Sequence, residues 1–535
     1  MKEIQNSYDN LPYFSMAFPE CSPTRIEAIA SFLSFTPPSS KSAKVLEIGC
    51  SYGGNIFPFA IANPDAKVVG IDLSEVQINK AKELAKQMRV DNIKFIQKDI
   101  CELSDEDVKE FGKFDYIICH GVYSWVPDAV KDAILKSIKR LLGKNGIAYV
   151  SYNVYPGWKI KDIIRDFLIF GTKELKDESE MVKANKAKEL LTVFKEYMKF
   201  CSQDSVKADF MNAKLLLEHI EGIEKIGSDS YIVHEYLEFF NNPMYFKDFA
   251  KNLDDNELAY LTDVNLDDVF RADLGLDAFD GYINANFTNR IDKEQAIDFF
   301  TNKDFRKSLI VHKDLLGENF HVDIGPDQLT KLHLIATFSK DKDGNYKNLI
   351  NEPMHPNYNW LYQVFSEVFP ASINFAQVAE LLKDNENSLK SAYLGFMEIL
   401  SADCALFSTH EKHKIDYEPG KTRLKERFIE YIKYFSIESS PVILPADMFN
   451  TVLNLSNFDA FIALKFNGKN TIEDIINQTS KFAQERGLNF TIGNGNSVVK
   501  TQTKKEFDKA VKDYVKDLED KLTKSYMFEY LNNNL

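Results

Sequence analysis

The sequence predicts an α/β fold built on a Rossmann-like, doubly wound parallel sheet, followed by a mostly helical middle region and a winged-helix-like α+β C-terminal region. Short apolar runs alternate with amphipathic stretches up to about residue 154, long helical stretches follow residue 157, and short β-like runs return near residue 405. The chain has 535 residues, which at roughly 100 to 200 residues per domain corresponds to about three or four domains. We expect domains over residues 1–158, 159–350, 351–437 and 438–535.

Composition limits the classes of function. Hydrophobic residues make up 44% of the chain and charged residues 27%, as in a globular protein, and the net charge is -15. An excess of carboxylates argues against nucleic acid as a partner, because binding to phosphates needs clustered Lys and Arg. The six cysteines form no C-x-x-C pair, and we expect a cytoplasmic protein with reduced thiols. The start has no apolar signal region and no run near 18 apolar residues follows, so we expect no membrane insertion.

The alternation of strands and helices carries the fold prediction. A helix is expected over 74–89, with an apolar stripe at helical spacing and Ser74 as its N-cap. Strand, helix, strand repeats of this kind form a doubly wound parallel sheet. The apolar runs that we interpret as buried strands cover 44–48, 67–71, 93–96, 114–118 and 147–150.

The period changes after Pro156-Gly157, where long helical stretches such as 181–200 and 208–223 begin. Beyond two prolines at 353 and 356, three helical stretches end near residue 401. They precede β-like runs at 405–408 and 414–417 that flank a polar turn. Helices followed by two short strands resemble a winged helix.

The last unit, after Pro441, shows two more helical stretches. A hairpin is expected around Gly493-Asn494-Gly495, because such residues suit tight turns. A charged helix is predicted from 504 to about 531, where Lys alternates with Asp and Glu.

The strongest chemical signal is the segment Glu47 to Gly54, E-I-G-C-S-Y-G-G, between a predicted strand and a predicted helix. Glycines there let the backbone pass close to a ligand. Asp72 ends the next strand, where a doubly wound fold presents a carboxylate to the ribose hydroxyls of an adenosine ligand. Asp99 follows the third strand.

Two ligands compete for this loop, because Gly49, Ser51 and Gly54 also form a dinucleotide fingerprint without its middle glycine. A carboxylate at Glu47 would repel a pyrophosphate but attract an ammonium or sulfonium group. Asp99 suits the amino group of adenine. These details favour S-adenosylmethionine over NAD, although each acid, taken alone, is also an ordinary residue at a strand end.

The acids and glycines of this region resemble the first three motifs of class I S-adenosylmethionine-dependent methyltransferases, with Ser51 where many members have glycine. This resemblance covers about the first 155 residues. Further segments resemble bacterial methyltransferases with a methyltransferase regulatory domain, and the layout of the whole chain resembles the rickettsial protein lysine methyltransferases that modify a surface-layer outer membrane protein. The segments are Y-D-x-x-P-Y from Tyr8, C-H-G-V-Y-S-W-V-P from Cys119, S-Y-N-V-Y-P-G-W from Ser151 and H-E-Y-L from His234.

The resemblance implies a protein lysine N-methyltransferase that uses S-adenosyl-L-methionine and acts on lysines of a surface protein of the outer membrane. It also suggests a dimer. The residues expected to bind the cofactor are Tyr13, Glu47, Gly49, Ser51, Gly53, Asp72, Leu73, Asp99, Ile100 and His120.

Residues after the fourth and fifth strands are the candidates for catalysis, because ligands lie beyond the carboxyl ends of parallel strands. A lone histidine in such a place is otherwise a hydrogen-bonded structural residue, and a tryptophan is otherwise part of the core. His234-Glu235-Tyr236 is expected to form a wall of the site or, alternatively, a helix cap or packing contact. The spacing His410-x-x-His413 lacks further ligands, so no metal is expected. The catalytic candidates are His120, Tyr123, Trp125, Asn153 and Tyr155.

The expected reaction is attack of a neutral lysine amine on a methyl group, and desolvation in an aromatic channel lowers the pKa of that amine. Three alternatives stay open. A small-molecule methyltransferase would modify a free amine or hydroxyl, and a non-catalytic protein would bind the cofactor to regulate an attached module. A DNA amino-methyltransferase would need an Asn/Asp-Pro-Pro-Tyr segment, which Cys119 to Pro127 does not contain.

Overall fold

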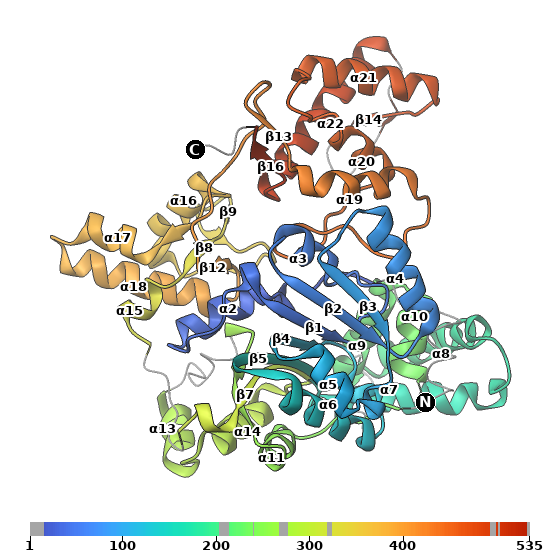
Figure 1. The fold of residues 1–535 in the computed structure, drawn as a ribbon, viewed down its shortest axis with the longest axis vertical. Helices are drawn as coiled ribbons and strands as arrows, with labels where there is room; N and C mark the ends of the chain where they lie inside the picture. The colour runs from blue at the N-terminus through green and yellow to red at the C-terminus, as the bar shows by residue number, and fades with distance from the viewer. Residues whose placement is uncertain are drawn as a thin grey trace.

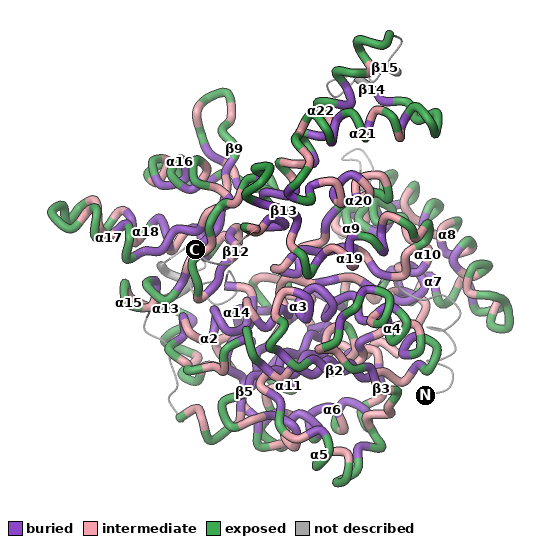
Figure 2. Tube along the Cα trace, turned by 45° about the horizontal axis from the view of Figure 1, so that its top comes forward, coloured by how far each residue is buried: buried purple, intermediate pink, exposed green. Residues whose placement is uncertain are grey.

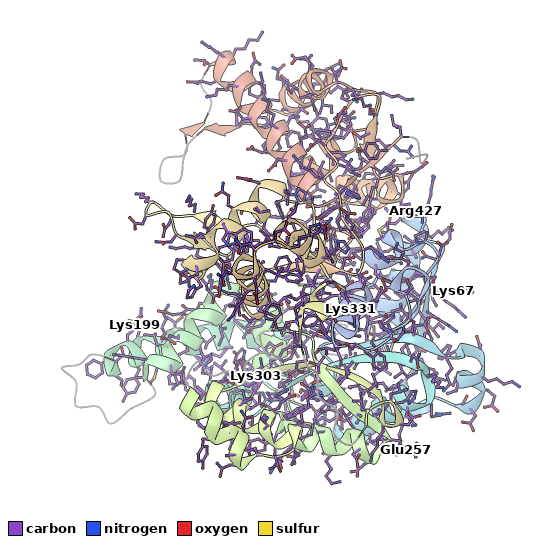
Figure 3. All side chains as sticks on the ribbon, turned by 90° about the vertical axis from the view of Figure 1, so that its left-hand side faces the viewer. Lys67, Lys199, Glu257, Lys303, Lys331 and Arg427 are labelled. Atoms are coloured by element: carbon purple, nitrogen blue, oxygen red, sulfur yellow. The ribbon has the colours of Figure 1, made fainter. Side chains whose placement is uncertain are left out.

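The computed structural model describes residues 15–202, 213–238, 240–266, 277–317, 324–492, 499–500 and 503–531. A central sheet lies in the middle of the molecule, with helical units around it (Figure 1). The strands of this sheet are buried, and exposed residues gather on the outer helices (Figure 2). Charged side chains such as Lys199 and Arg427 lie on the outer surface of different units (Figure 3).

Among the described residues, the main sheet has seven strands in the order β3-β2-β1-β4-β5-β7-β6. The strands β1 to β5 run parallel, as predicted, whereas β7 pairs antiparallel with β5 and with β6. Their bounds are β1 (Lys44–Ile48), β2 (Lys67–Asp72), β3 (Ile93–Gln97), β4 (Phe114–Cys119), β5 (Leu142–Asn153), β6 (Leu258–Asp263) and β7 (Phe305–His312).

The strands β6 and β7 lie in the region that the sequence indicated as mostly helical, so the sheet includes strands from both sides of the predicted boundary at 158/159. Polar residues interrupt their apolar pattern. Asp263 in β6 and Arg306 in β7 are buried because they pair with one another. The pattern of a buried strand is therefore absent from the sequence at these positions.

Helices cover both faces of the sheet, as a doubly wound fold requires. Alternate residues of β1 point to opposite cores: Val45 packs with α2 (Pro23–Phe32), α3 (Phe57–Ala62) and α4 (Glu75–Gln87), and Leu46 packs with α6 (Asp128–Leu141) and α11 (Phe246–Asp255). The predicted N-cap of α4 is confirmed, because Ser74 Oγ accepts a hydrogen bond from Gln77 N at 3.1 Å.

The middle region beyond β5 begins with an α-helical bundle. The helix predicted over 181–200 is confirmed by α8, and α9 covers the described part of the helix predicted over 208–223, since 203–212 lie outside the described residues. No helix in the described ranges is long and apolar enough to span a membrane. The bundle contains α7 (Trp158–Thr172), α8 (Glu180–Cys201), α9 (Ala213–Ile226), α10 (Asp229–Ile232) and a π-helical turn, Val233–Leu237.

The three helical stretches after the prolines are confirmed as α16 (Asn359–Val368), α17 (Phe375–Leu382) and α18 (Glu386–Ser401). The first β-like run forms β12 (Leu406–Ser408), but the strand predicted over 414–417 is wrong. β12 pairs instead with β8 (His333–Ile335), whose other edge carries β11 (Ile373–Asn374). A strand from earlier in the chain thus takes the place of the expected hairpin partner.

Beyond Pro441, the two predicted helical stretches are confirmed as α20 (Asn457–Ala463) and α21 (Ile472–Glu485), and the charged helix as α22 (Lys504–Lys524). The structure adds α19 (Glu426–Ile437), which precedes Pro441 and which the sequence analysis did not predict. Antiparallel β14 (Thr491–Ile492) and β15 (Val499–Lys500) support the predicted hairpin, whose Gly493-Asn494-Gly495 turn lies outside the described residues. The final helix ends before the predicted residue 531. Tyr526 takes a left-handed φ of 54°, and β16 (Phe528–Tyr530) then pairs with β13 (Thr422–Leu424).

Candidate active site

A cavity of about 620 Å³ lies at the carboxyl ends of the parallel strands β1 to β5. This is the place where an open α/β sheet binds its ligands. The structure brings most of the predicted site residues together here. Those that line the cavity are Glu47, Gly49, Ser51, Asp72, Leu73, Asp99, Ile100, His120, Trp125 and Asn153.

The loop after β1 depends on its glycine. Gly49 has a φ of +77°, and a Cβ there would lie 2.4 Å from Val122 Cγ2. Ser51 also takes a positive φ, of 49°, and its N–H donates to Asp72 Oδ2 at 2.8 Å. The serine that departs from the family pattern is thus held in this strained region by Asp72. Gly53, with a φ of +82°, faces Phe95 in the core and turns the chain away from the cavity lining.

Asp72 connects the loops after β1 and β2. One oxygen accepts from Ser51 N, and the other accepts from Ser74 N at 2.9 Å. Asp99, at the end of β3, accepts from Cys101 N at 2.9 Å and lies beside Ile100 in the cavity wall. Both carboxylates are thereby fixed by backbone N–H groups in the cavity wall.

Glu47 is a buried carboxyl with one unused oxygen. Its side chain is only 4% exposed. Oε1 accepts from Asn55 Nδ2 at 2.6 Å, whereas Oε2 has no hydrogen-bond partner among the described residues. Burial, with a smaller contribution from Asp72, raises the pKa of Glu47 to about 8. An incoming positive group would satisfy the free oxygen and favour the ionised form.

His120 is held as a neutral imidazole. Its Nδ1 lies 2.9 Å from the hydroxyl oxygen of Tyr149, and its ring centroid lies 4.0 Å from that of Phe18. Burial lowers the pKa of His120 to about 4, although Glu20 opposes this effect. The ring therefore adds no positive charge to the cavity at pH 7.

Trp125 and Asn153 form the wall beyond β4 and β5. The Trp125 ring meets Trp158 edge to face with centroids 6.2 Å apart. Asn153 N donates to Ser124 Oγ at 2.8 Å, and Asn153 Nδ2 donates to Asn241 Oδ1 at 3.0 Å. The amide nitrogen is a donor only, so the acceptor that this side chain can offer is Oδ1.

Besides Gly53, two of the described candidates do not line the cavity. Tyr123 is buried beneath the wall, and its ring meets Phe249 edge to face at 5.4 Å. Tyr155 lies against Tyr245 with centroids 5.5 Å apart. Tyr13 lies outside the described residues.

The structure adds lining residues that the sequence analysis did not single out. Asn55 follows the glycine-rich loop directly, and Ser15 and Phe18 follow closely after the candidate Tyr13, so both neighbourhoods offered a usable signal. His234 and Glu235 do line the cavity, as one of the two interpretations of this motif expected. They come from the π-helical turn Val233–Leu237, a kind of turn frequently found at functional sites. The added residues are Ser15, Met16, Phe18, Asn55, Gln77, Lys98, Lys161, Tyr231 and Phe305.

The charges of the cavity favour a cation. Its carboxyl groups belong to Glu47, Asp72, Asp99 and Glu235. The lysines of the wall are paired with carboxylates, Lys98 with Asp107 at 2.6 Å and Lys161 with Asp304 at 2.7 Å. A pyrophosphate would meet mainly negative groups, whereas a sulfonium or ammonium group would meet complementary ones. Within the described ranges, no cluster of His, Cys, Asp and Glu could hold a metal ion.

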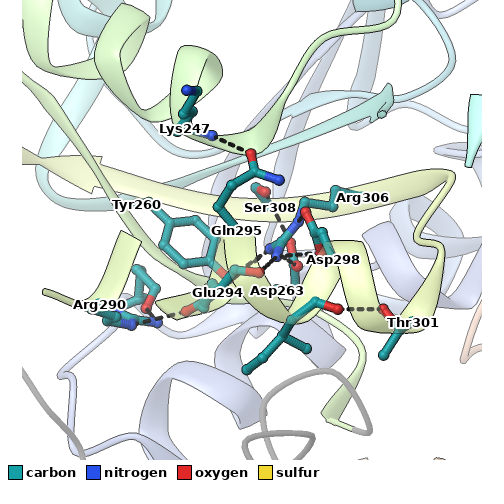
Figure 4. Close-up of polar contacts among 12 residues, drawn as sticks. Lys247, Tyr260, Asp263, Arg290, Glu294, Gln295, Asp298, Thr301, Arg306 and Ser308 are labelled. Atoms are coloured by element: carbon teal, nitrogen blue, oxygen red, sulfur yellow. Dashed lines mark hydrogen bonds and ion pairs between the residues drawn. The ribbon is translucent and has the colours of Figure 1, made fainter. Parts of the chain in front are cut away.

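A buried network of charged side chains lies next to β5, at the edge of this strand that faces β7 (Figure 4). Arg306 of β7 contacts Asp263 at 2.5 Å, and its guanidinium also reaches Glu294 and Asp298 of α14 (Arg290–Thr301) at 3.1 and 2.9 Å. Ser308 Oγ donates to Asp263 and lies 3.0 Å from the hydroxyl of Tyr152, the neighbour of Asn153. The network thus connects β6, β7 and α14 to the strand that carries Asn153.

Family models match two partly overlapping parts of the chain. A methyltransferase domain matches residues 39–241, which include every described strand of the parallel part of the sheet. A predicted methyltransferase regulatory domain matches residues 228–312, from the N-cap of α10 to the end of β7.

Similar proteins extend this assignment. RP789 of Rickettsia prowazekii is 28% identical over 494 residues, 88% of this chain and 85% of its own, and RP028 of the same organism is 35% identical over 245 residues, 46% of this chain and 92% of its own. The structure of PKMT2 from Rickettsia typhi in complex with AdoHcy has a TM-score of 0.80 and 25% identity, and covers 97% of this chain and 100% of that chain. The chain belongs to the S-adenosylmethionine-dependent methyltransferases that carry a methyltransferase regulatory domain.

Proposed function

We propose that this protein is a protein lysine N-methyltransferase that modifies lysine side chains of a surface protein. The observation that carries the proposal is the likeness to PKMT2 of Rickettsia typhi over 97% of this chain, far beyond the methyltransferase domain. A methyltransferase for a small molecule needs little more than its catalytic fold. The additional units are the parts of this chain that would hold a polypeptide. We propose that the reaction takes place in the cytoplasm and that the enzyme acts as a dimer.

The cavity residues fit the methyl donor. We assign Asp72 to the ribose hydroxyls, Asp99 to the adenine amino group, and Glu47 to the ammonium of the methionine part. The unused Oε2 of Glu47 is the observation that fits this last role. Gly49 and Ser51 would allow close approach of the backbone, and Leu73 and Ile100 would cover the adenine faces. The remaining candidate, Gly53, would act by turning the loop.

The part of the cavity that would receive the substrate lysine would favour loss of a proton from its amine. The chemistry supplied by bound S-adenosylmethionine is an electrophilic methyl carbon on a positively charged sulfur. A lysine with an ordinary pKa of about 10.4 is almost fully protonated at pH 7 and then has no lone pair. Trp125 and Trp158 would desolvate the amine and so lower its pKa, and Asn153 Oδ1 would orient it by accepting an N–H.

The other candidates would have supporting roles. His120 would stay neutral and hold its wall without repelling a cation. Tyr123 would act indirectly, since it is a buried residue of the same helical turn that carries Trp125, and Tyr155 would support the wall near Asn153. A proton lost by the amine would leave through water, because the pKa of His120 of about 4 makes it a weak base at pH 7.

Methyl transfer to an isolated lysine-containing surface protein tests the proposal. The enzyme is incubated with methyl-labelled S-adenosylmethionine and either this protein, free lysine or a small phenol, and products are analysed by mass spectrometry. We expect methylated lysines in the protein and no transfer to the small molecules. Transfer to free amines or hydroxyls alone would support the small-molecule alternative, and binding without turnover would support the regulatory one.

A further inference from the structure

A residue from the C-terminal part of the chain contacts the loop between β1 and α3, residues 49–56, which we call the methyl-donor loop. Asn450, 1% exposed, lies between α19 and α20. Its Nδ2 donates to the backbone oxygen of Asn55 at 2.7 Å and lies 3.3 Å from Asn55 Oδ1. Asn55 in turn donates to Glu47 at 2.6 Å. Asn55, which lies 395 residues from Asn450 in the sequence, therefore connects Asn450 to the buried carboxyl of Glu47.

The hydrogen-bond partners fix the orientation of both amides. The backbone N–H of Phe18 donates to Asn55 Oδ1 at 3.0 Å, and an N–H can only donate. The other end of the Asn55 amide, which faces Glu47, must then be its nitrogen. Asn450 faces two oxygens of Asn55, so its nitrogen must point toward them. Each orientation follows from groups whose role as donor or acceptor is unambiguous.

Asn450 is itself held in place. It has a left-handed φ of 61°, a conformation that asparagine tolerates better than most residues. Asp447 Oδ1 accepts from the N–H groups of Phe449 and Thr451 at 2.8 and 3.0 Å, which closes the turn around Asn450. The amide is thus presented to Asn55 by a rigid, buried turn.

The segment before this turn is joined to the same loop. Ser15 N donates to Val442 O at 3.1 Å, and Leu444 N donates to Ser15 O at 3.0 Å. Ser15 Oγ accepts from Gly54 N at 2.9 Å, and a Cβ on Gly54 would lie 2.3 Å from Ser15 O. The residues near 15–18 therefore lie between the methyl-donor loop and the C-terminal turn.

We propose that Asn450 is a positioning residue for methyl-donor binding, which keeps the Asn55 amide nitrogen on Glu47 so that an ionised Glu47 can receive the ammonium group of the donor. This role rests on the function proposed above for Glu47. Without Asn450, the Phe18 N–H still donates to Asn55 Oδ1, but the backbone oxygen of Asn55 and this Oδ1 lose the donor that Asn450 supplies. The Asn55 amide is then held less firmly, its hydrogen bond to Glu47 weakens, and the protonated form of Glu47 is favoured.

Few other groups influence the charge of Glu47. Asp72 on β2 disfavours its ionised form. The facing thiols stay protonated because burial raises their pKa values. Asn55 is the group that favours the carboxylate, so its orientation decides the balance. The thiols belong to Cys21 before α2, Cys50 after β1 and Cys119 on β4.

The test is calorimetric titration of the full chain with S-adenosylmethionine. Asn450→Gly removes the amide and suits the left-handed backbone. Asn351→Gly is the matched control, because Asn351 is an exposed asparagine with a φ of 66°. We expect about tenfold weaker binding for Asn450→Gly, the size of a lost hydrogen bond that supports a charge. The control should bind within about twofold of the wild type.

A double-mutant cycle separates positioning from a general loss of structure. In a Glu47→Gln background, Asn450→Gly should weaken binding no further, because the group that it positions is gone. The pH at which affinity rises should also move upward in Asn450→Gly. Equal losses in both backgrounds, or unchanged binding in Asn450→Gly, would overturn the inference. Failure of the wild type to bind the methyl donor would instead overturn the proposed function together with the inference.

If circular dichroism shows that Asn450→Gly does not fold, Asn450→Asp is the second variant. It keeps the backbone preference, lacks the N–H donor of the amide, and should show the same weakening.

Discussion

At the scale of single residues, the buried Glu47 predicts a distinctive pH dependence of stability. Its pKa is about 8 in the folded protein and about 4.3 in an unfolded chain. A raised pKa gives stability that is fully present below pH 4.3 and is lost as the pH rises to 8. Relative to Glu47→Gln, the free energy of unfolding of the wild type should fall over this window by at most about 5 kcal/mol. Urea titrations of both proteins at several pH values measure the difference, and parallel curves would contradict it.

Substitutions of Asp72 and Asn153 are expected to affect different quantities, the affinity for the methyl donor and the rate of transfer. Asp72→Ala removes the acceptor of two loop N–H groups as well as the proposed ribose contact. We expect at least about 100-fold weaker donor binding. Asn153→Ala should lower kcat about tenfold with donor affinity nearly unchanged, because it orients the acceptor. Titration with donor and steady-state rates measure the two effects. Equal loss of donor affinity in both variants would reject this division of roles.

At the scale of elements, the network around Arg306 predicts how the added strands are held to the sheet. Arg306→Met leaves Asp263, Glu294 and Asp298 in a buried cluster without their shared cation. Breaking such a buried pair costs about 3–5 kcal/mol. Burial already raises the pKa of Asp298 to about 6, so protonation should relieve part of the loss at low pH. Thermal melts at pH 8 and pH 5 should show a larger drop at pH 8, and an equal drop at both values would contradict this account.

The same elements show what could be predicted from sequence. The strands β1 to β5 follow from apolar runs, and the acids at their carboxyl ends indicate the cavity because parallel strands end at one edge. The strands β6 and β7 were not predicted, because some of their buried residues are charged, as the ion pair of Asp263 and Arg306 shows. The candidate Tyr13 indicated the neighbourhood of Ser15 and Phe18, but Asn450 could not be predicted as part of the site, since only the packing of distant segments brings it to the loop after β1.

At the scale of the whole molecule, the methyl-donor site joins parts of the chain that are far apart in sequence. Gly54 of the loop, Ser15 of the N-terminal segment and Leu444 of the C-terminal part share consecutive hydrogen bonds. The unit of α16 to α18 lies on the other side of the molecule from α7 to α10 (Figure 1) and contributes no residue to the described cavity lining. Binding should therefore stabilise the segments around Ser15 and Leu444 together with the sheet.

Hydrogen exchange measures this coupling. A ligand at about 100 times its Kd stabilises the folded state by about 2.7 kcal/mol. Opening of the donor loop breaks the bonds made by the N–H groups of Gly54, Ser15 and Leu444, so S-adenosylmethionine should slow their exchange in parallel. Amides of α17, which has no residue in the cavity, serve as the internal control. Slower exchange in the loop after β1 alone, with Ser15 and Leu444 unchanged, would mean that the C-terminal part is energetically independent of the donor.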